Sequence, residues 1–137
     1  IIKPRYIKKL ILSPSSNSIA DFCIPLCATI HLSGSTMKIV GTSMAILLLQ
    51  GESINFFMYL GFIMMLGITM VAAPGVPGGA IMAAIAILQS ILGFNEQAIA
   101  LMIAVYVAID SFGTACNVTG DGAISLIVNR FKKRLVS

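Results

Sequence analysis

Charged residues are scarce in this chain. They make up 10% of its 137 residues, whereas hydrophobic residues make up 58%, and the mean hydropathy is +0.98. A soluble domain of this size needs a polar surface that such a composition does not supply, so the composition excludes a soluble domain. It indicates a membrane protein whose helices are surrounded by lipid, with the bilayer as its main partner.

Basic residues are almost absent from the interior of the sequence. Lys38 is the single Lys or Arg between Phe22 and Asn129. The others lie near the two ends: Lys3, Arg5, Lys8, Lys9, Arg130, Lys132, Lys133 and Arg134. This distribution argues against a nucleic-acid partner, despite a formal net charge of +4. By the positive-inside rule it predicts a multi-pass protein of the cell membrane with both ends cytoplasmic and an even number of complete crossings.

The chain has three cysteines, which is too few for a disulfide framework. Cys23 and Cys27 are four residues apart in an apolar segment, and Cys116 lies far from both. No neighbouring His or acidic residue completes a metal-binding set around them, so we expect packing roles. The sequence therefore predicts no cofactor.

The first apolar segment, residues 19–50, is too long for one simple membrane span of about 20 residues. Its middle, "ATIHLSGST", is small and hydroxylic, which predicts a helix broken near residues 30–35. The basic, polar residues 1–18 before it are predicted to be a cytoplasmic linker. Residues 131–137 are predicted to be a basic cytoplasmic tail.

The second apolar segment, residues 54–92, contains the stretch "MVAAPGVPGGAIMAA". Two prolines and three glycines fall within residues 74–79 and must interrupt the helix. The arm that follows, residues 80–92, is about 20 Å long as a helix, too short to cross a bilayer. We therefore favour a re-entrant hairpin over the alternative, a turn joining two ordinary spanning helices.

Broken backbone at membrane depth restricts where these segments can lie. Its N–H and C=O groups lack partners in lipid, so such segments are found buried in protein or lining a wet cavity. Two broken elements in one short chain are typical of a transport site. The predicted fold is an all-α membrane protein with a broken transmembrane helix, a re-entrant helical hairpin and a last transmembrane helix over residues 97–128, for which Asn95 is a candidate N-cap.

The last helix carries a polar stripe, formed by Asp110, Thr114, Asn117 and Asp121. Steps of 4, 3 and 4 residues place these side chains on one helical face. A carboxylate within a transmembrane segment costs at least about 2.5 kcal/mol and is by default functional. The stripe offers hard oxygen ligands for a small cation, unless one Asp simply pairs with Lys38.

Two basic side chains lie inside or near the first break. His31 is equally consistent with a proton or cation site and with a hydrogen-bonded packing role. Lys38 lies too deep in its segment to reach the interface easily, so we expect it to pair with a carboxylate.

Three motifs in this order resemble the sodium-coupled dicarboxylate and amino-acid symporters, the glutamate-transporter-like family. "PLCATIHLSGST" resembles the seventh-helix stretch of that family, "APGVPGG" the tip of its second re-entrant hairpin, and "DSFGTACNVTGD" its eighth-helix motif. The resemblance covers residues 19–130. It identifies the chain as the C-terminal part of a transport domain, since the scaffold helices and the first hairpin of the family are absent from it, and the initial residue Ile1 fits this expectation.

The resemblance implies roles for individual residues, with sodium as the coupling ion. The substrate-binding residues would be Ser35, Val76, Asp110, Thr114 and Asn117, with Asp110 holding an amino group if the substrate has one. One sodium ion would be held by Asn117, Asp121 and the Cys27 carbonyl. A second would be held by Thr29 and the carbonyls of Met70, Val71 and Ala73. The hairpin would be the extracellular gate.

The sequence departs from the family pattern at three positions. Gly113 replaces the Arg that binds a side-chain carboxylate, which favours a neutral amino acid or an acid bound by other residues. His31 and Ser33 replace an Asn and an Asp, and that Asp is associated with a third cation. We hypothesise that Lys38 replaces the charge of this cation and lowers the number of sodium ions per cycle.

The function predicted from the sequence is sodium-coupled symport of a small amino acid or dicarboxylate. By resemblance, the partners are the N-terminal half of the same protein and two further copies in a homotrimer. The alternatives are a truncated product without activity and a channel-like pore. An intramembrane enzyme is disfavoured, because Asp110 and Asp121 are about 16 Å apart along a helix and cannot share a proton.

Overall fold

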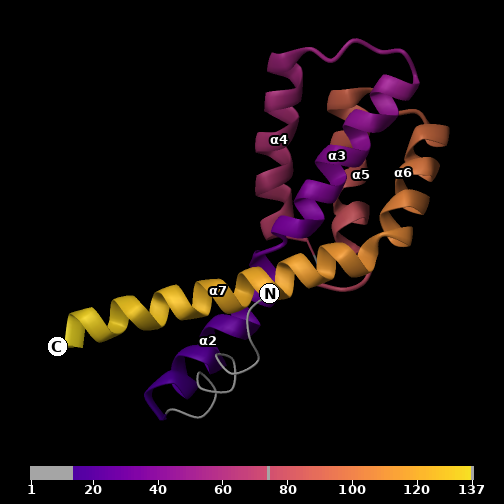
Figure 1. The fold of residues 1–137 in the computed structure, drawn as a ribbon. Helices are drawn as coiled ribbons and strands as arrows, with labels where there is room; N and C mark the ends of the chain where they lie inside the picture. Colours follow the sequence, from indigo (N-terminus) through magenta and orange to yellow (C-terminus); the bar gives the residue numbers. More distant parts are fainter. Residues whose placement is uncertain (1–13, 74, 137) are drawn as a thin grey trace.

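The computed structural model describes residues 14–73 and 75–136, and these residues form helices and short connections without a strand. The helices are α2 (Pro14–Ile30), α3 (Ser33–Leu49), α4 (Phe56–Val71), α5 (Gly79–Leu92), α6 (Glu96–Ala108) and α7 (Asp110–Val136). Helices α3 to α6 form a bundle, while α2 and α7 pack against each other and extend away from one end of it (Figure 1). The predicted all-α class is confirmed for the described residues.

The first apolar segment is broken where its sequence predicts. Helix α2 ends at Ile30 and α3 begins at Ser33, so that His31 and Leu32 connect them. The break is short, because the His31 N–H still donates to the Cys27 carbonyl at 2.8 Å. Helix α2 starts at Pro14 rather than at residue 19, in keeping with the preference of Pro for the first helical turn. Residues 1–13 of the predicted linker lie outside the described residues.

The second apolar segment forms a helical hairpin. Helices α4 and α5 pack along each other and are joined by the Pro/Gly stretch (Figure 1). The Asn55 side chain caps α4 by accepting hydrogen bonds from the N–H groups of Phe57 at 3.0 Å and Met58 at 3.3 Å. Gly78 has φ +75°, a left-handed conformation that glycine adopts without strain, and α5 starts directly after it.

The prediction of one last helix over residues 97–128 is wrong, because the segment consists of two helices. Helices α6 and α7 meet at Ile109 with a bend of 62°. The bend allows α6 to pack in the bundle while α7 crosses α3 and continues along α2 (Figure 1). The N-cap prediction is confirmed, because Asn95 Oδ1 accepts from the Ala98 N–H at 2.8 Å. Helix α7 also runs to Val136, through most of the predicted tail 131–137.

The bundle has an apolar core surrounded by an equally apolar surface. Phe62, Leu66, Leu88 and Met102 are fully buried where α4, α5 and α6 meet. Many large apolar side chains remain exposed, for example Phe57 at 81%. Such a surface needs lipid or protein around it.

Two stretches of the described chain are candidates for crossing a membrane. The run Ile19–Leu49 is long and apolar enough, and so is the bent pair formed by Glu96–Ala108 and Asp110–Lys132. Helices α4 and α5 are apolar but shorter. This pattern agrees with a hairpin whose arms differ from full spans.

Small residues bring α3 and α7 close together. At Gly34 an added Cβ would lie 2.6 Å from both the Gly113 carbonyl oxygen and Cys116 Cβ. Glycine at such a contact lets two backbones approach closely, which is how helices associate in lipid without a hydrophobic driving force between them.

Replacing Gly34 with Ala should therefore destabilise the protein by about 1–3 kcal/mol, because backbone at Gly113 would have to move. Gly41→Ala is the matched control on the same helix, since an added Cβ there meets nothing within 4 Å. Thermal unfolding of the full-length protein in detergent measures both. Equal melting temperatures for the two variants would show that the contact between α3 and α7 is not tight.

Candidate functional site

A cavity of about 260 Å³ lies where the break between α2 and α3, the hairpin turn and the first turns of α7 meet. Its walls combine apolar side chains with carboxylate, hydroxyl, amide and imidazole groups. The lining residues are Ala28, His31, Leu32, Ser35, Gly75, Val76, Pro77, Ala80, Tyr106, Asp110, Thr114, Asn117, Val118 and Asp121. Both broken elements therefore contribute to one cavity, opposite the polar face of α7.

The structure brings together all the residues predicted to bind substrate. Ser35, Val76, Asp110, Thr114 and Asn117 each line the cavity. They come from α3, the hairpin turn and α7, which are distant in sequence. Residues far apart in the sequence therefore share one cavity.

The residues predicted to bind cations are more dispersed. Asn117 and Asp121 line the cavity, whereas the remaining ones are not among its lining residues: Cys27, Thr29, Met70, Val71 and Ala73. The Thr29 hydroxyl donates to the Leu26 carbonyl at 2.7 Å within α2. The predicted first set thus approaches the cavity through Asn117 and Asp121, and the predicted second set lies outside its lining.

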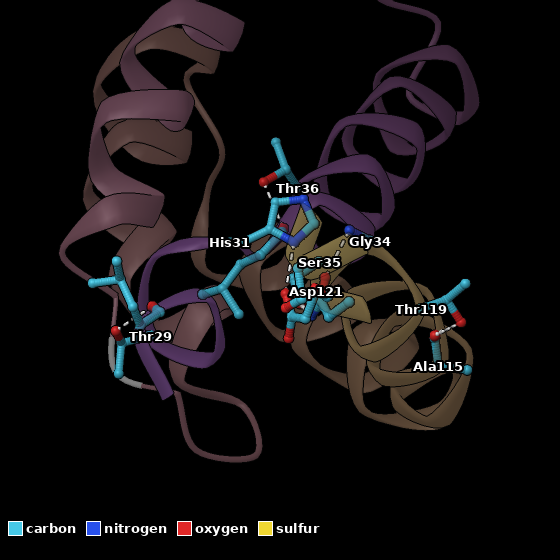
Figure 2. Close-up of polar contacts among 12 residues, drawn as sticks. Thr29, His31, Gly34, Ser35, Thr36, Ala115, Thr119 and Asp121 are labelled. Atoms are coloured by element: carbon cyan, nitrogen blue, oxygen red, sulfur yellow. Dashed lines mark hydrogen bonds and ion pairs between the residues drawn. The ribbon is translucent and has the colours of Figure 1, made fainter. Parts of the chain in front are cut away.

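His31 pairs with the buried carboxylate of Asp121. Its Nδ1 lies 2.8 Å from Asp121 Oδ1, so the residue in the break of the first segment contacts the far end of the polar stripe. Figure 2 shows the imidazole ring positioned over Asp121. Asp121 is 7% exposed, and a carboxylate this deep requires a polar partner. His31 supplies it.

Lys38 pairs with the other carboxylate of the stripe, as expected. Its Nζ lies 2.8 Å from Asp110 Oδ1 and 3.7 Å from the centroid of the Tyr106 ring. Tyr106 is on α6 and Asp110 on α7, so these two partners lie on either side of the bend at Ile109. The ammonium group is thereby held between an anion and an aromatic face, both of which favour a cation.

Two glycines of α7 make room for these basic side chains. At Gly113 an added Cβ would lie 2.4 Å from Lys38 Cε and 2.8 Å from its Nζ. At Gly120 an added Cβ would lie 2.4 Å from His31 Cε1. Glycine at these two positions thus leaves the room that the ends of the Lys38 and His31 side chains occupy.

Asn117, between the two pairs, binds the start of α3. Its Oδ1 accepts a hydrogen bond from the Gly34 N–H at 2.8 Å, and its Nδ2 donates to Ser35 Oγ at 3.1 Å. No side chain of α3 itself caps this helix. The N–H groups in the first turn of a helix lack internal partners, so Asn117 serves as a cap from a neighbouring helix.

The hairpin turn closes one side of the cavity by touching α2. An added Cβ at Gly75 would lie 2.9 Å from the Ala28 carbonyl oxygen. Glycine thus permits a close backbone approach between the turn and the end of α2. Val76 and Pro77 follow directly and line the cavity.

Sequence reasoning overlooked Tyr106 and the reason for the two glycines. Tyr106 is one of three tyrosines and precedes Asp110 by four residues, a spacing that would have placed both on one face of an uninterrupted helix. Gly113 and Gly120 are part of the motif "DSFGTACNVTGD", but their partners Lys38 and His31 are 75 or more residues away along the chain. Only the crossing of α3 and α7 reveals them.

The cysteines show no metal-binding arrangement. Cys23 and Cys27 are buried and Cys116 is exposed, and all three are free thiols. Within the part of the chain that the structure describes, no group of three or more His, Cys, Asp or Glu side chains is arranged to hold a metal ion. Any cation bound here would have to use backbone and amide oxygens as well.

Comparison with known proteins identifies the family. The model of the sodium:dicarboxylate symporter family matches residues 4–131, nearly the whole chain, and the chain belongs to this family. Searches among curated proteins and among solved structures gave no match. The family is one of transporters, so the cavity belongs to a membrane protein that handles small carboxylate substrates.

Gly120→Ala should displace His31 from Asp121 and lower the stability by about 1–3 kcal/mol, because the ring and the buried carboxylate lose their mutual contact. Gly122→Ala is the matched control two residues away, where an added Cβ meets nothing within 4 Å. Thermal unfolding of the purified full-length protein compares them. A melting temperature for Gly120→Ala equal to that of Gly122→Ala would contradict the placement of His31.

Proposed function

We propose that this chain is part of the transport core of a secondary symporter that carries a small carboxylate-bearing substrate, an amino acid or a dicarboxylate, together with sodium. The observation that supports this most strongly is the cavity, in which two interrupted helical elements face two carboxylates. Interrupted helices around a shared site are typical of secondary transporters.

The hairpin supports a gating role in this proposal. Its turn contributes Gly75, Val76 and Pro77 to the cavity wall and approaches the end of α2 closely at Gly75. A movement of this turn would open the cavity without separating α7 from α3. In the proposed arrangement the hairpin is re-entrant and is the extracellular gate, and the basic ends of the chain are cytoplasmic.

A sodium ion suits the donor set around Asp121. The carboxylate is buried, His31 occupies Oδ1, and among the described residues the structure records no partner for Oδ2. The Cys27 carbonyl accepts a hydrogen bond from the backbone N–H of His31, the residue whose ring pairs with Asp121. Carboxylate, carbonyl and amide oxygens are the ligands that hard cations prefer. We propose Asp121, Asn117 and Cys27 as ligands of one sodium ion.

The second proposed sodium set uses Thr29 and the carbonyls of Met70, Val71 and Ala73. Met70 and Ala73 are buried at the end of α4, where the Met70 carbonyl accepts a hydrogen bond from the Ala73 N–H at 3.4 Å. Such a helix C-terminus favours a cation. The same proposal includes a lowered number of sodium ions per cycle. It also includes a homotrimer in which each copy has the N-terminal part of the protein.

A channel-like pore is the second candidate function, favoured by the polar stripe, which would line a path through the membrane. A pore conducts without obligatory binding steps, whereas a symporter alternates between two closed forms. The contribution of the hairpin turn to the cavity wall supports the symporter. An inactive truncated product is the remaining alternative, and the transport assay below also addresses it.

The full-length protein in liposomes should accumulate a labelled dicarboxylate or amino acid when a sodium gradient is imposed, and should exchange it in counterflow. Asp121→Asn should reduce the sodium-dependent uptake at least tenfold, since it removes the proposed ligand charge. Gln89→Ala, an exposed position on α5 outside the cavity lining, is the control and should behave as wild type. Flux without counterflow would favour a pore, and no flux an inactive product.

A further inference from the structure

The Asp110 carboxylate is already occupied by a cation that belongs to the protein. Lys38 Nζ lies 2.8 Å from Asp110 Oδ1, and the Lys38 side chain is 8% exposed. An ammonium group removed from water to this extent is stable only with a close counter-charge. Asp110 supplies that counter-charge and is therefore neutralised from within the chain.

The position of the ammonium group is fixed from three helices. Lys38 is on α3, the Tyr106 ring that it faces at 3.7 Å is on α6, and Asp110 is on α7. The space for its terminal atoms exists because residue 113 is glycine, as any side chain there would start 2.8 Å from Nζ. This arrangement is specific, because it requires a basic residue, an acid, an aromatic ring and a glycine at matching positions.

Asp110 and Tyr106 line the cavity, whereas Lys38 is not among the lining residues and meets Asp110 from α3. A substrate amino group entering the cavity would meet two acids that are both already paired, Asp110 with the ammonium group of Lys38 and Asp121 with the imidazole of His31. One carboxylate cannot balance two ammonium groups, and like charges at close range repel each other. An amino-bearing substrate would have to displace Lys38 or accept this repulsion.

We propose that Lys38, admitted by Gly113, is a specificity-determining residue that makes the cavity prefer carboxylates without an amino group over their 2-amino counterparts. Its ammonium group neutralises the Asp110 carboxylate, which would otherwise be free to bind a substrate amino group. The inference rests on the proposed function and refines it, because it selects between the two substrate classes named there.

The test uses matched pairs of compounds that differ by one amino group: succinate with aspartate, glutarate with glutamate, and propionate with alanine. Their affinities for the purified full-length protein are measured by calorimetry in saturating sodium. Wild type should bind the compound without the amino group at least tenfold more tightly. Lys38→Met, which keeps an unbranched apolar side chain and removes the charge, should shift this ratio at least tenfold toward the amino compound.

The double variant Lys38→Met with Asp110→Asn is the control for the role of Asp110. Without the carboxylate, removing the lysine should no longer favour the amino compound, so the ratio should return toward that of wild type. A shift of equal size in the single and the double variant would contradict the proposal, because it would show that Lys38 acts by packing alone.

A second variant keeps the test decisive where Lys38→Met does not fold. Lys38→Gln removes the charge but keeps a polar head group of similar reach, and it should shift the ratio in the same direction, whereas Gly122→Ala should not. An unchanged ratio in the folded variants overturns the inference while binding itself upholds the proposed function. Absence of binding for every compound in every variant rejects the proposed function and this inference together.

Discussion

The pairing of two carboxylates with two basic side chains of the chain itself determines how this cavity is built. Asp110 and Asp121 lie on a helix surrounded by apolar surface, where an unpaired charge is costly. Lys38 and His31 meet them at 2.8 Å each. Because the basic residues lie in and just after the break between α2 and α3, the pairs also fix α7 across that break. The bend of 62° between α6 and α7 follows from the same crossing, since α6 stays in the bundle.

Glycine is the second constraint, and it depends on the first. Gly113 and Gly120 leave space for Lys38 and His31, and Gly34 lets the two backbones approach until Asn117 can cap α3. Close packing through small residues replaces the hydrophobic driving force that helices lack in lipid. The cavity therefore lies between the tight α3–α7 contact and the hairpin turn. That turn approaches α2 closely at Gly75.

Much of this arrangement could be predicted from the sequence, and the rest could not for physical reasons. Length, hydropathy and Pro/Gly punctuation located the first break and the hairpin, and the 4, 3, 4 spacing placed Asp110 to Asp121 on one face. The bend at Ile109 has no Pro or Gly to mark it, because it results from packing against distant helices. The partners of Asp121 and of the two glycines are likewise contacts between segments 75 or more residues apart, which no local pattern encodes. The roles of Cys27, Thr29 and the carbonyls at the end of α4 stay predictions.

The central claim is that the chain neutralises its own carboxylates around a cavity closed by the hairpin. An experimental structure of the full-length protein in lipid nanodiscs, at a resolution that shows side chains, tests it most directly. The account predicts Lys38 Nζ and His31 Nδ1 within hydrogen-bond distance of Asp110 and Asp121, with Val76 and Pro77 facing them across the cavity. Density that places either carboxylate away from its basic partner, or the hairpin turn remote from α7, would contradict it.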